Sequence, residues 1–258
     1  LREGRLTPLA IYALLPWLAK RMAVSQGVSP YGSIGGQPGP GIKERSLLTN
    51  GLLTGLLLAL GIALDPVFLI PFLTIFLGLF AGSLLSGKTI GINRLLKSFY
   101  LSIGVASLLH FPLIIDLLTG RSASSLIGFE AWRKGTLGAS GIFNLDTGSF
   151  TNSSFTWTLL IVAVFALVFG KEKHLFLGVR SWLIIIFGFF AVWFADQGWW
   201  PGRTPEEETL FVPVAVGLAW ASAIATAGMG SDLADPNPKK LYLRRISIGI
   251  AALSLGVS

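Results

Sequence analysis

The chain has 258 residues, of which 52% are apolar and only 13% are charged, and its mean hydropathy is +0.70. Soluble domains carry about 25% charged residues, so this composition argues against a soluble globular enzyme, a disordered tail and a nucleic-acid-binding protein. It indicates an all-α polytopic integral membrane helical bundle, in which the net charge of +7 reflects orientation in the bilayer.

Long uncharged stretches predict the membrane-spanning helices. A helix that crosses a hydrocarbon layer of about 30 Å needs about 20 residues with few charges. The stretches near this length lie at residues 46–64, 66–87, 98–115, 147–170, 175–195 and 209–231. With a short apolar segment at 6–19 and an incomplete one at 246–258, the prediction is about eight spans. We expect the first and last to be truncated, so that residues 1–258 form a single transmembrane domain of a longer chain.

Small residues one helical turn apart predict close packing between the helices. Gly51 and Gly55 form one such pair, and Gly78 and Gly82 form another. Pairs of this kind let helix backbones approach closely in lipid. We expect them to pack the bundle, with an interface between two copies of the chain as the alternative.

The distribution of lysine and arginine predicts the orientation of the spans. Four connections, at residues 20–46, 87–97, 171–180 and 231–245, hold 14 of the 20 basic residues. The positive-inside rule therefore places these four on the cytoplasmic side, with Arg180 close enough to a span end to snorkel. The Gly/Pro-rich segment 20–46 is predicted to be a cytoplasmic loop, and 116–154 a long extracytoplasmic loop.

Two short motifs match catalytic patterns without the context that the chemistry needs. Residues 82–89, Gly-Ser-Leu-Leu-Ser-Gly-Lys-Thr, fit the phosphate-binding loop by letter, but that loop must follow a strand. Here the first residues are expected to form the last turn of a span. Residues 146–149, Asp-Thr-Gly-Ser, resemble the active-site strand of an aspartic protease, which needs two such carboxylates in a β-rich body. We expect neither activity.

Candidate catalytic residues come from the acids of the predicted outer loops. The candidates are Asp65, Asp116 and Asp146, because a catalytic base or a metal ligand that acts near the membrane would occupy positions of this kind. The alternative is structural, since loop acids are usually solvated or cap helices. His110 is the ionisable residue deep within a predicted span, which makes it a candidate for a proton relay or for a structural role beside Pro112. No metal site is predicted from residue spacing.

Two stretches of sequence resemble a known family. They are residues 142–149, Ile-Phe-Asn-Leu-Asp-Thr-Gly-Ser, and residues 179–219, which include Ala-Asp-Gln-Gly-Trp-Trp at 195–200 and Pro-Glu-Glu-Glu-Thr-Leu-Phe-Val-Pro at 205–213. They resemble the C-terminal membrane region of large actinobacterial glycosyltransferases of the family-two type. Those chains carry an N-terminal nucleotide-sugar domain followed by many spans. The resemblance covers roughly the second half of the chain.

The resemblance implies a part in cell-envelope sugar transfer. The catalytic acids of that family belong to the N-terminal domain, so none is carried over to this chain. The nucleotide sugar and a divalent metal would bind that domain, and no cofactor is expected in these residues. The chain alone is therefore not expected to catalyse a reaction.

Three functions are weighed on this basis. The first is the membrane region of a cell-envelope glycosyltransferase, which anchors a catalytic domain and holds a polyprenyl-phosphate-linked sugar or a cell-wall polysaccharide acceptor. The second is a multi-span transferase with lipid-linked sugar donors and chemistry on the outer acids. The third is a transporter or flippase of lipid-linked sugars, a class in which internal repeats are common. All three place the chain in a bacterial plasma membrane, in contact with the lipid bilayer and not with nucleic acid.

Overall fold

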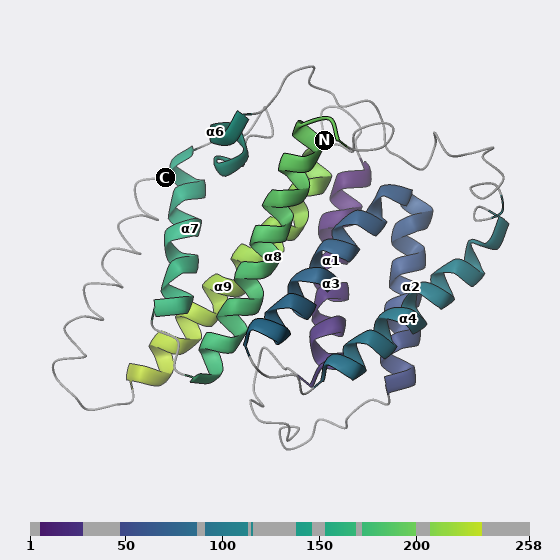
Figure 1. Cartoon of the computed structure of the whole chain (residues 1–258), viewed down its shortest axis with the longest axis horizontal. Coiled ribbons are helices and arrows are strands. Elements are labelled where there is room, and N and C mark those ends of the chain that lie inside the picture. The colour runs from purple at the N-terminus through teal and green to yellow at the C-terminus, as the bar shows by residue number, and fades with distance from the viewer. Residues whose placement is uncertain are drawn as a thin grey trace.

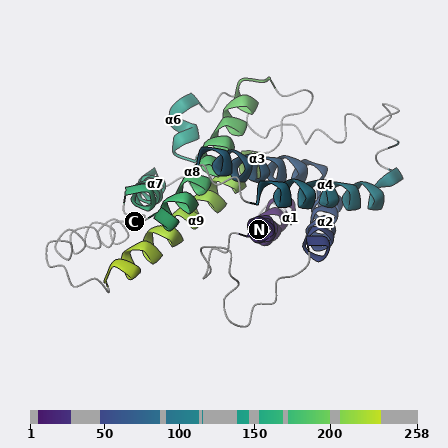
Figure 2. The same cartoon turned by 60° about the horizontal axis from the view of Figure 1, so that its bottom comes forward.

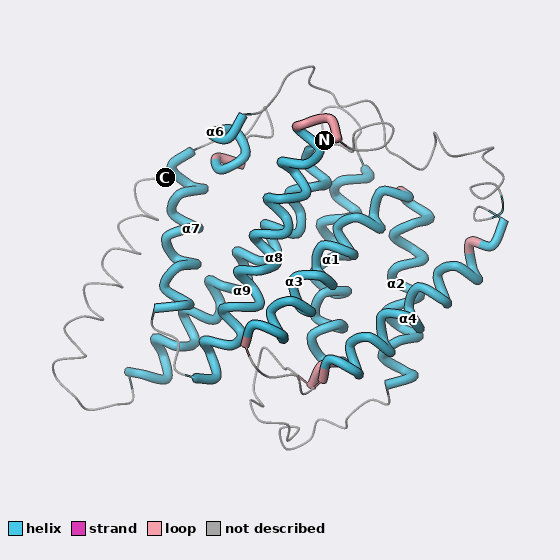
Figure 3. The backbone as a smooth tube through the Cα atoms, in the orientation of Figure 1, coloured by secondary structure: helices cyan, strands magenta, loops and turns pink. Residues whose placement is uncertain are grey.

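A computed structural model describes residues 6–27, 47–86, 91–112, 115, 138–145, 153–168, 172–199 and 207–233. These residues form helices, with a few turn residues at the helix ends (Figures 1 and 3). The elements are α1 (Leu6–Ser25), α2 (Leu47–Leu64), the 3-10 helix η1 (Pro66–Phe68), α3 (Leu69–Leu85), α4 (Ile92–Leu109), α6 (Gly138–Phe143), α7 (Ser153–Val168), α8 (Glu172–Asp196) and α9 (Glu207–Leu233). The all-α prediction is confirmed for this part of the chain, which contains no strand.

Four of these helices are long and apolar enough to cross a membrane, at Leu47–Leu64, Pro66–Leu85, Leu175–Asp196 and Glu208–Ala227. They agree closely with the predicted spans at 46–64, 66–87, 175–195 and 209–231. The chain is therefore consistent with a polytopic membrane protein. The predicted number of about eight spans is not confirmed, and the segment 246–258 lies outside the described residues.

The other predicted spans differ from the helices in the structure. The stretch 98–115 belongs largely to α4, which begins at Ile92 and ends at Leu109. This helix includes the exposed side chains of Arg94 and Lys97 and buries Leu95, Ser98, Ser102 and Ala106 on one face. It is thus amphipathic rather than uniformly apolar. Within 147–170 the described apolar helix is shorter, at Trp157–Leu167.

Several predicted loops also contain helix. The helix α8 begins at Glu172 and α4 at Ile92, so most of 171–180 and the second half of 87–97 are helical. Residues 20–25 continue α1, and α6 lies within 116–154. Charged residues mark the ends of apolar stretches in the sequence, but helices extend past that point because backbone hydrogen bonding does not depend on side-chain polarity.

Glycine pairs set the closest helix contacts, as the sequence predicts. A Cβ built on Gly55 would lie 2.7 Å from Cβ of Val105 on α4. A Cβ built on Gly78 would lie 2.7 Å from Cα of Ile184 on α8. The helices α2 and α4 therefore pack along one glycine seam, and α3 and α8 along another. Both seams lie within one chain.

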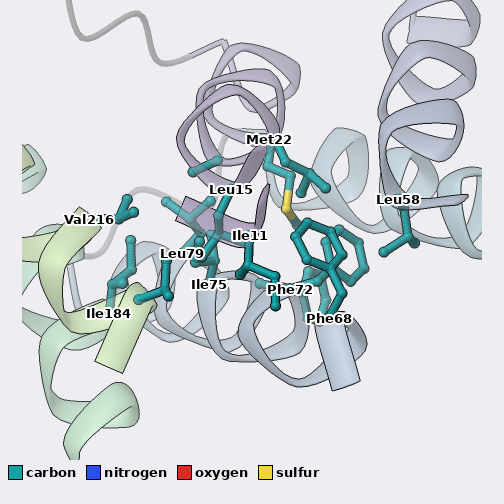
Figure 4. Packing of buried hydrophobic residues seen from close by; sticks show 14 of the residues in the cluster. Ile11, Leu15, Met22, Leu58, Phe68, Phe72, Ile75, Leu79, Ile184 and Val216 are labelled. Atoms are coloured by element: carbon teal, nitrogen blue, oxygen red, sulfur yellow. The ribbon is translucent and has the colours of Figure 1, made fainter. Parts of the chain in front are cut away.

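The helix α1 lies between these groups of helices. Both views show it between α2 on one side and α9 on the other (Figures 1 and 2). Its buried side chains Ile11, Leu15 and Met22 meet Phe72 and Ile75 of α3 in a common core (Figure 4). A second core lies among α7, α8 and α9 and is formed by residues such as Ala163, Ile185, Val214, Leu218 and Ala221.

Exposed leucines follow one another along α2 in a row that winds partway around the helix, because four residues are slightly more than one turn. Leu48, Leu52, Leu56, Leu60 and Leu64 follow one another at four-residue steps, and each is 46–63% exposed. Residues four apart are neighbours on the surface of an α-helix. A contiguous apolar row of this length suits contact with lipid acyl chains rather than with water.

Candidate functional site

Asp65 is the one predicted catalytic acid that the described residues include, and the structure gives it a capping position. It lies in the turn between α2 and η1 and is 9% exposed. Its carboxylate accepts a hydrogen bond of 2.9 Å from the backbone N–H of Val67, and Pro66 occupies the first turn after it. An acidic N-cap followed by proline is a standard start for a helical turn. Asp65 thus has a structural role that needs no substrate.

The environment of Asp65 changes its acidity. Burial raises the pKa of its carboxyl above the ordinary value of 3.8, and the hydrogen bond from Val67 opposes that rise. The nearby ring of Phe68 packs so closely on Gly61 that no side chain larger than hydrogen fits there. This apolar packing explains why desolvation is the larger effect.

Capping predicts how substitutions of Asp65 affect stability. We expect Asp65→Ala to lower the free energy of unfolding by about 1 kcal/mol, because the N–H of Val67 loses its acceptor. Asp65→Asn keeps an acceptor and should change it by only a few tenths of a kcal/mol. Thermal unfolding of the purified protein in detergent would measure both. A larger loss in Asp65→Asn than in Asp65→Ala would contradict the capping role.

The raised pKa also predicts a pH dependence. Because the folded protein holds this proton more tightly than the unfolded chain does, stability should fall as the pH rises from 3.8 through the folded pKa. Above that value the full cost of burying the charged carboxylate is present. Asp65→Asn cannot titrate, so we expect the fall to be absent from this variant when the two proteins are unfolded across the acid range.

The remaining candidate acids, Asp116 and Asp146, lie outside the described residues. The residues just before Asp146 are visible: Leu145 has a positive φ of 51°, and the Asn144 side chain accepts a 3.0 Å hydrogen bond from the indole of Trp157. Within the described ranges, no three His, Asp or Glu residues gather as a metal-binding group would require. Of the three predicted outer acids, the described residues thus contain Asp65 alone, and no metal-binding group of described residues forms around it.

His110 lies at the end of a helix rather than deep within a span. It is the C-cap residue of α4, and its Nδ1 lies 3.0 Å from the backbone carbonyl oxygen of Ala106. The backbone N–H of His110 donates to the same oxygen over 3.0 Å, so the main chain and the imidazole of His110 both contact the carbonyl that closes the last turn of α4. Of the two predicted roles, this geometry supports the structural one.

The motif at 82–89 begins in helix, as predicted. Gly82–Leu85 belong to the last turn of α3, and Ser86 is its C-cap. The Ser83 hydroxyl donates to the carbonyl of Leu79 over 2.7 Å. Lys88 and Thr89 lie outside the described residues. In this geometry, the amides of Gly82 and Ser83 belong to the helix and cannot cradle a phosphate as a loop would.

The sequence did not reveal three buried polar residues located where α1 and α3 end and α8 begins, namely Gln26, Ser83 and Arg180, here called the polar junction. The Gln26 amide donates a 3.0 Å hydrogen bond to the Ser83 hydroxyl. On the neighbouring residue of α3, a Cβ built on Gly82 would lie 2.6 Å from Cγ of Arg180. Arg180 is only 5% exposed, so the prediction that it snorkels to water is wrong for the packed bundle. The sequence signal for this burial was the position of Arg180 within an otherwise apolar run.

Comparison with known proteins gives no further guide to this site: no protein-family model, no curated protein and no solved structure matches the chain.

Proposed function

We propose that the chain is the membrane region of a bacterial cell-envelope glycosyltransferase. In this role it anchors a catalytic domain to the plasma membrane and holds a lipid-linked sugar or polysaccharide acceptor beside it. The ends of α1 and α3 and the start of α8 face the cytoplasm, where nucleotide sugars are found. Asp65 and the end of α8 face outward.

The packing of the residues that carry the family resemblance supports this proposal. Ile142 of α6 is buried in the core formed with α8 and α9, and these two helices contain most of the resembling segment 179–219. The indole N–H of Trp182 also donates a 2.9 Å hydrogen bond to the carbonyl of Ala163 on α7. Segments far apart in the sequence thus meet in one body, as expected if the resemblance reflects a shared membrane unit.

The capping role of Asp65 favours an anchor over a transferase with its own outer catalytic acids. The Asp65 carboxylate is occupied by the amide of Val67 and is nearly buried. A general base must reach the proton that it removes. A side chain held in this way is poorly placed for that task.

The test expresses the whole coding sequence that contains this chain and assays its membranes. We expect transfer of labelled sugar from nucleotide sugars to endogenous lipid or polysaccharide. The triple variant Asp65→Asn, Asp116→Asn and Asp146→Asn should keep this activity within about twofold, because the three acids stand outside the chemistry.

Two outcomes would contradict the proposal. Transfer from polyprenyl-linked donors that the triple variant abolishes would favour the transferase with outer acids. Ion-dependent flux of lipid-linked sugars without any transfer would favour a transporter. The unsubstituted protein and a variant at an exposed leucine, Leu56→Ala, serve as controls for expression and insertion.

A further inference from the structure

Arg180 is a cation without a counter-charge in the part of the molecule that the structure describes. Its side chain is 5% exposed, and its Nε has no hydrogen-bond partner. The structure describes the side chains of three carboxylates, Asp65, Asp196 and Glu208. All three lie at the other end of the bundle from Arg180, where α2 and α8 end and α9 begins. A buried charge with no partner is strongly unfavourable. An anion that is not among these described carboxylates would offset that cost.

The position of Arg180 limits where that anion can bind. Arg180 is five residues into the span Leu175–Asp196, which corresponds to a depth of about 8 Å along the helix. Side chains of an α-helix lean toward its N-terminus. Arg180 therefore lies near the end of the span where α8 begins, close to the head-group region and away from the middle of the apolar layer.

The neighbouring groups add polarity at the same level. Gln26 follows the last residue of α1, and its amide donates to Ser83 in the last turn of α3. The oxygen of this amide group, Oε1, has no hydrogen-bond partner. The polar junction of α1, α3 and α8 therefore contains two unsatisfied polar atoms, one of them on a cation. Such groups in native proteins call for a partner, and the described part of the chain supplies none.

The charge of this end of the bundle favours an anionic ligand. Lys20 is exposed near the end of α1, with its Nζ 5.7 Å from the ring centre of Trp17. The next residue, Arg21, donates a hydrogen bond of 3.4 Å to the side-chain oxygen of Asn50. A guanidinium presents a rigid fork of donors that matches the oxygens of a phosphate group.

We propose that Arg180, at the polar junction, binds a phosphate group. The group belongs either to an anionic lipid head group or to a free phosphate ion that reaches this end of the bundle. The site does not depend on the function proposed above, because it rests only on the burial, position and unsatisfied atoms of Arg180 and Gln26.

The experiment compares phosphatidylglycerol, phosphatidylcholine and inorganic phosphate as probes. The purified chain in neutral detergent is titrated with each lipid and analysed by native mass spectrometry. In parallel, its thermal unfolding is followed in sodium phosphate and in sodium chloride of equal ionic strength. We expect phosphatidylglycerol to be retained in preference to phosphatidylcholine.

Arg180→Met should lose about tenfold in affinity for phosphatidylglycerol, as expected when a charge-assisted hydrogen-bonding group is removed. A methionine of similar length leaves no buried charge, so this variant is expected to fold. The matched control is Lys20→Gln, which removes one positive charge from the same end and should stay within about twofold of the unsubstituted protein. Arg180→Lys, which keeps the charge but loses the fork, should bind severalfold more weakly.

The outcomes separate the sources of the phosphate. If phosphatidylglycerol alone discriminates between the unsubstituted protein and Arg180→Met, the ligand is a lipid head group. If phosphate also raises the unfolding temperature of the unsubstituted protein but not of Arg180→Met, the site accepts the free ion. Equal retention of phosphatidylglycerol by the unsubstituted protein and Arg180→Met would overturn the proposal. If Arg180→Met does not fold, equal retention by Arg180→Lys would overturn it.

Discussion

Phe72→Ala is expected to lower the free energy of unfolding by about 3–5 kcal/mol, the largest effect of any substitution considered. Phe72 is 0% exposed and stacks on Phe99 of α4, with ring centres 5.6 Å apart and planes within 7°. It also packs beside Met22 of α1 (Figure 4). Truncation leaves a cavity where α1, α3 and α4 meet, and the surrounding helices can fill it only in part.

Unfolding in a graded series of denaturing detergent would measure this loss. The control is Leu56→Ala, since Leu56 is 51% exposed on the leucine row of α2. Its loss should be much smaller, because lipid or detergent replaces the missing contacts. If the two variants lost the same stability, the core of α1, α3 and α4 would not be the packed unit described above.

Gly78→Leu should separate α3 from α8. A Cβ at this position would lie 2.7 Å from Cα and 2.8 Å from N of Ile184, and backbone atoms cannot turn aside as a side chain can. Overpacking in a filled interior costs about 1–3 kcal/mol and exceeds that when the backbone must move. We therefore expect a loss of at least about 2 kcal/mol, despite the better helix propensity of leucine.

Gly104→Ala is the matched control for the glycine seam. Gly104 lies within α4, and a Cβ built there would have nothing within 4 Å. Alanine is favoured over glycine in a helix interior by about 1 kcal/mol. This variant should therefore be slightly more stable than the unsubstituted protein. If Gly78→Leu were tolerated as well as Gly104→Ala, the close approach of α3 and α8 would not be required for folding.

Hydropathy predicted the helices that are apolar along their whole length. The break at Asp65-Pro66 was visible because proline lacks an amide donor and aspartate favours a cap. Gly51, Gly55, Gly78 and Gly82 were likewise informative, because small residues one turn apart have a direct packing consequence in lipid. For α2, α3, α8 and α9, local composition was sufficient to predict the spans.

The rest depended on contacts between helices, which no local pattern encodes. α4 carries Arg94 and Lys97 within its first turns, so a search for uncharged stretches placed its start too late. The role of His110 follows from where the helix ends, and the burial of Arg180 follows from how α8 packs on Gly82. For the candidate site, the sequence supplied Asp65 as a residue of interest, but only the turn geometry distinguishes a cap from a base.

The spanning segments of α2 and α8 differ in length, with consequences for how the protein sits in a membrane. The span in α2 has 18 residues and that in α8 has 22, which correspond to about 27 Å and about 33 Å of helix. A single bilayer thickness cannot match both if they stand parallel. When α2 stands upright in a bilayer matched to its leucine row, α8 fits the same layer at a tilt of about 35°, within the range that membrane helices adopt. In a thicker bilayer α8 would tilt less, whereas the span of α2 would become shorter than the hydrocarbon layer. Of the two, α2 is therefore the segment more sensitive to bilayer thickness.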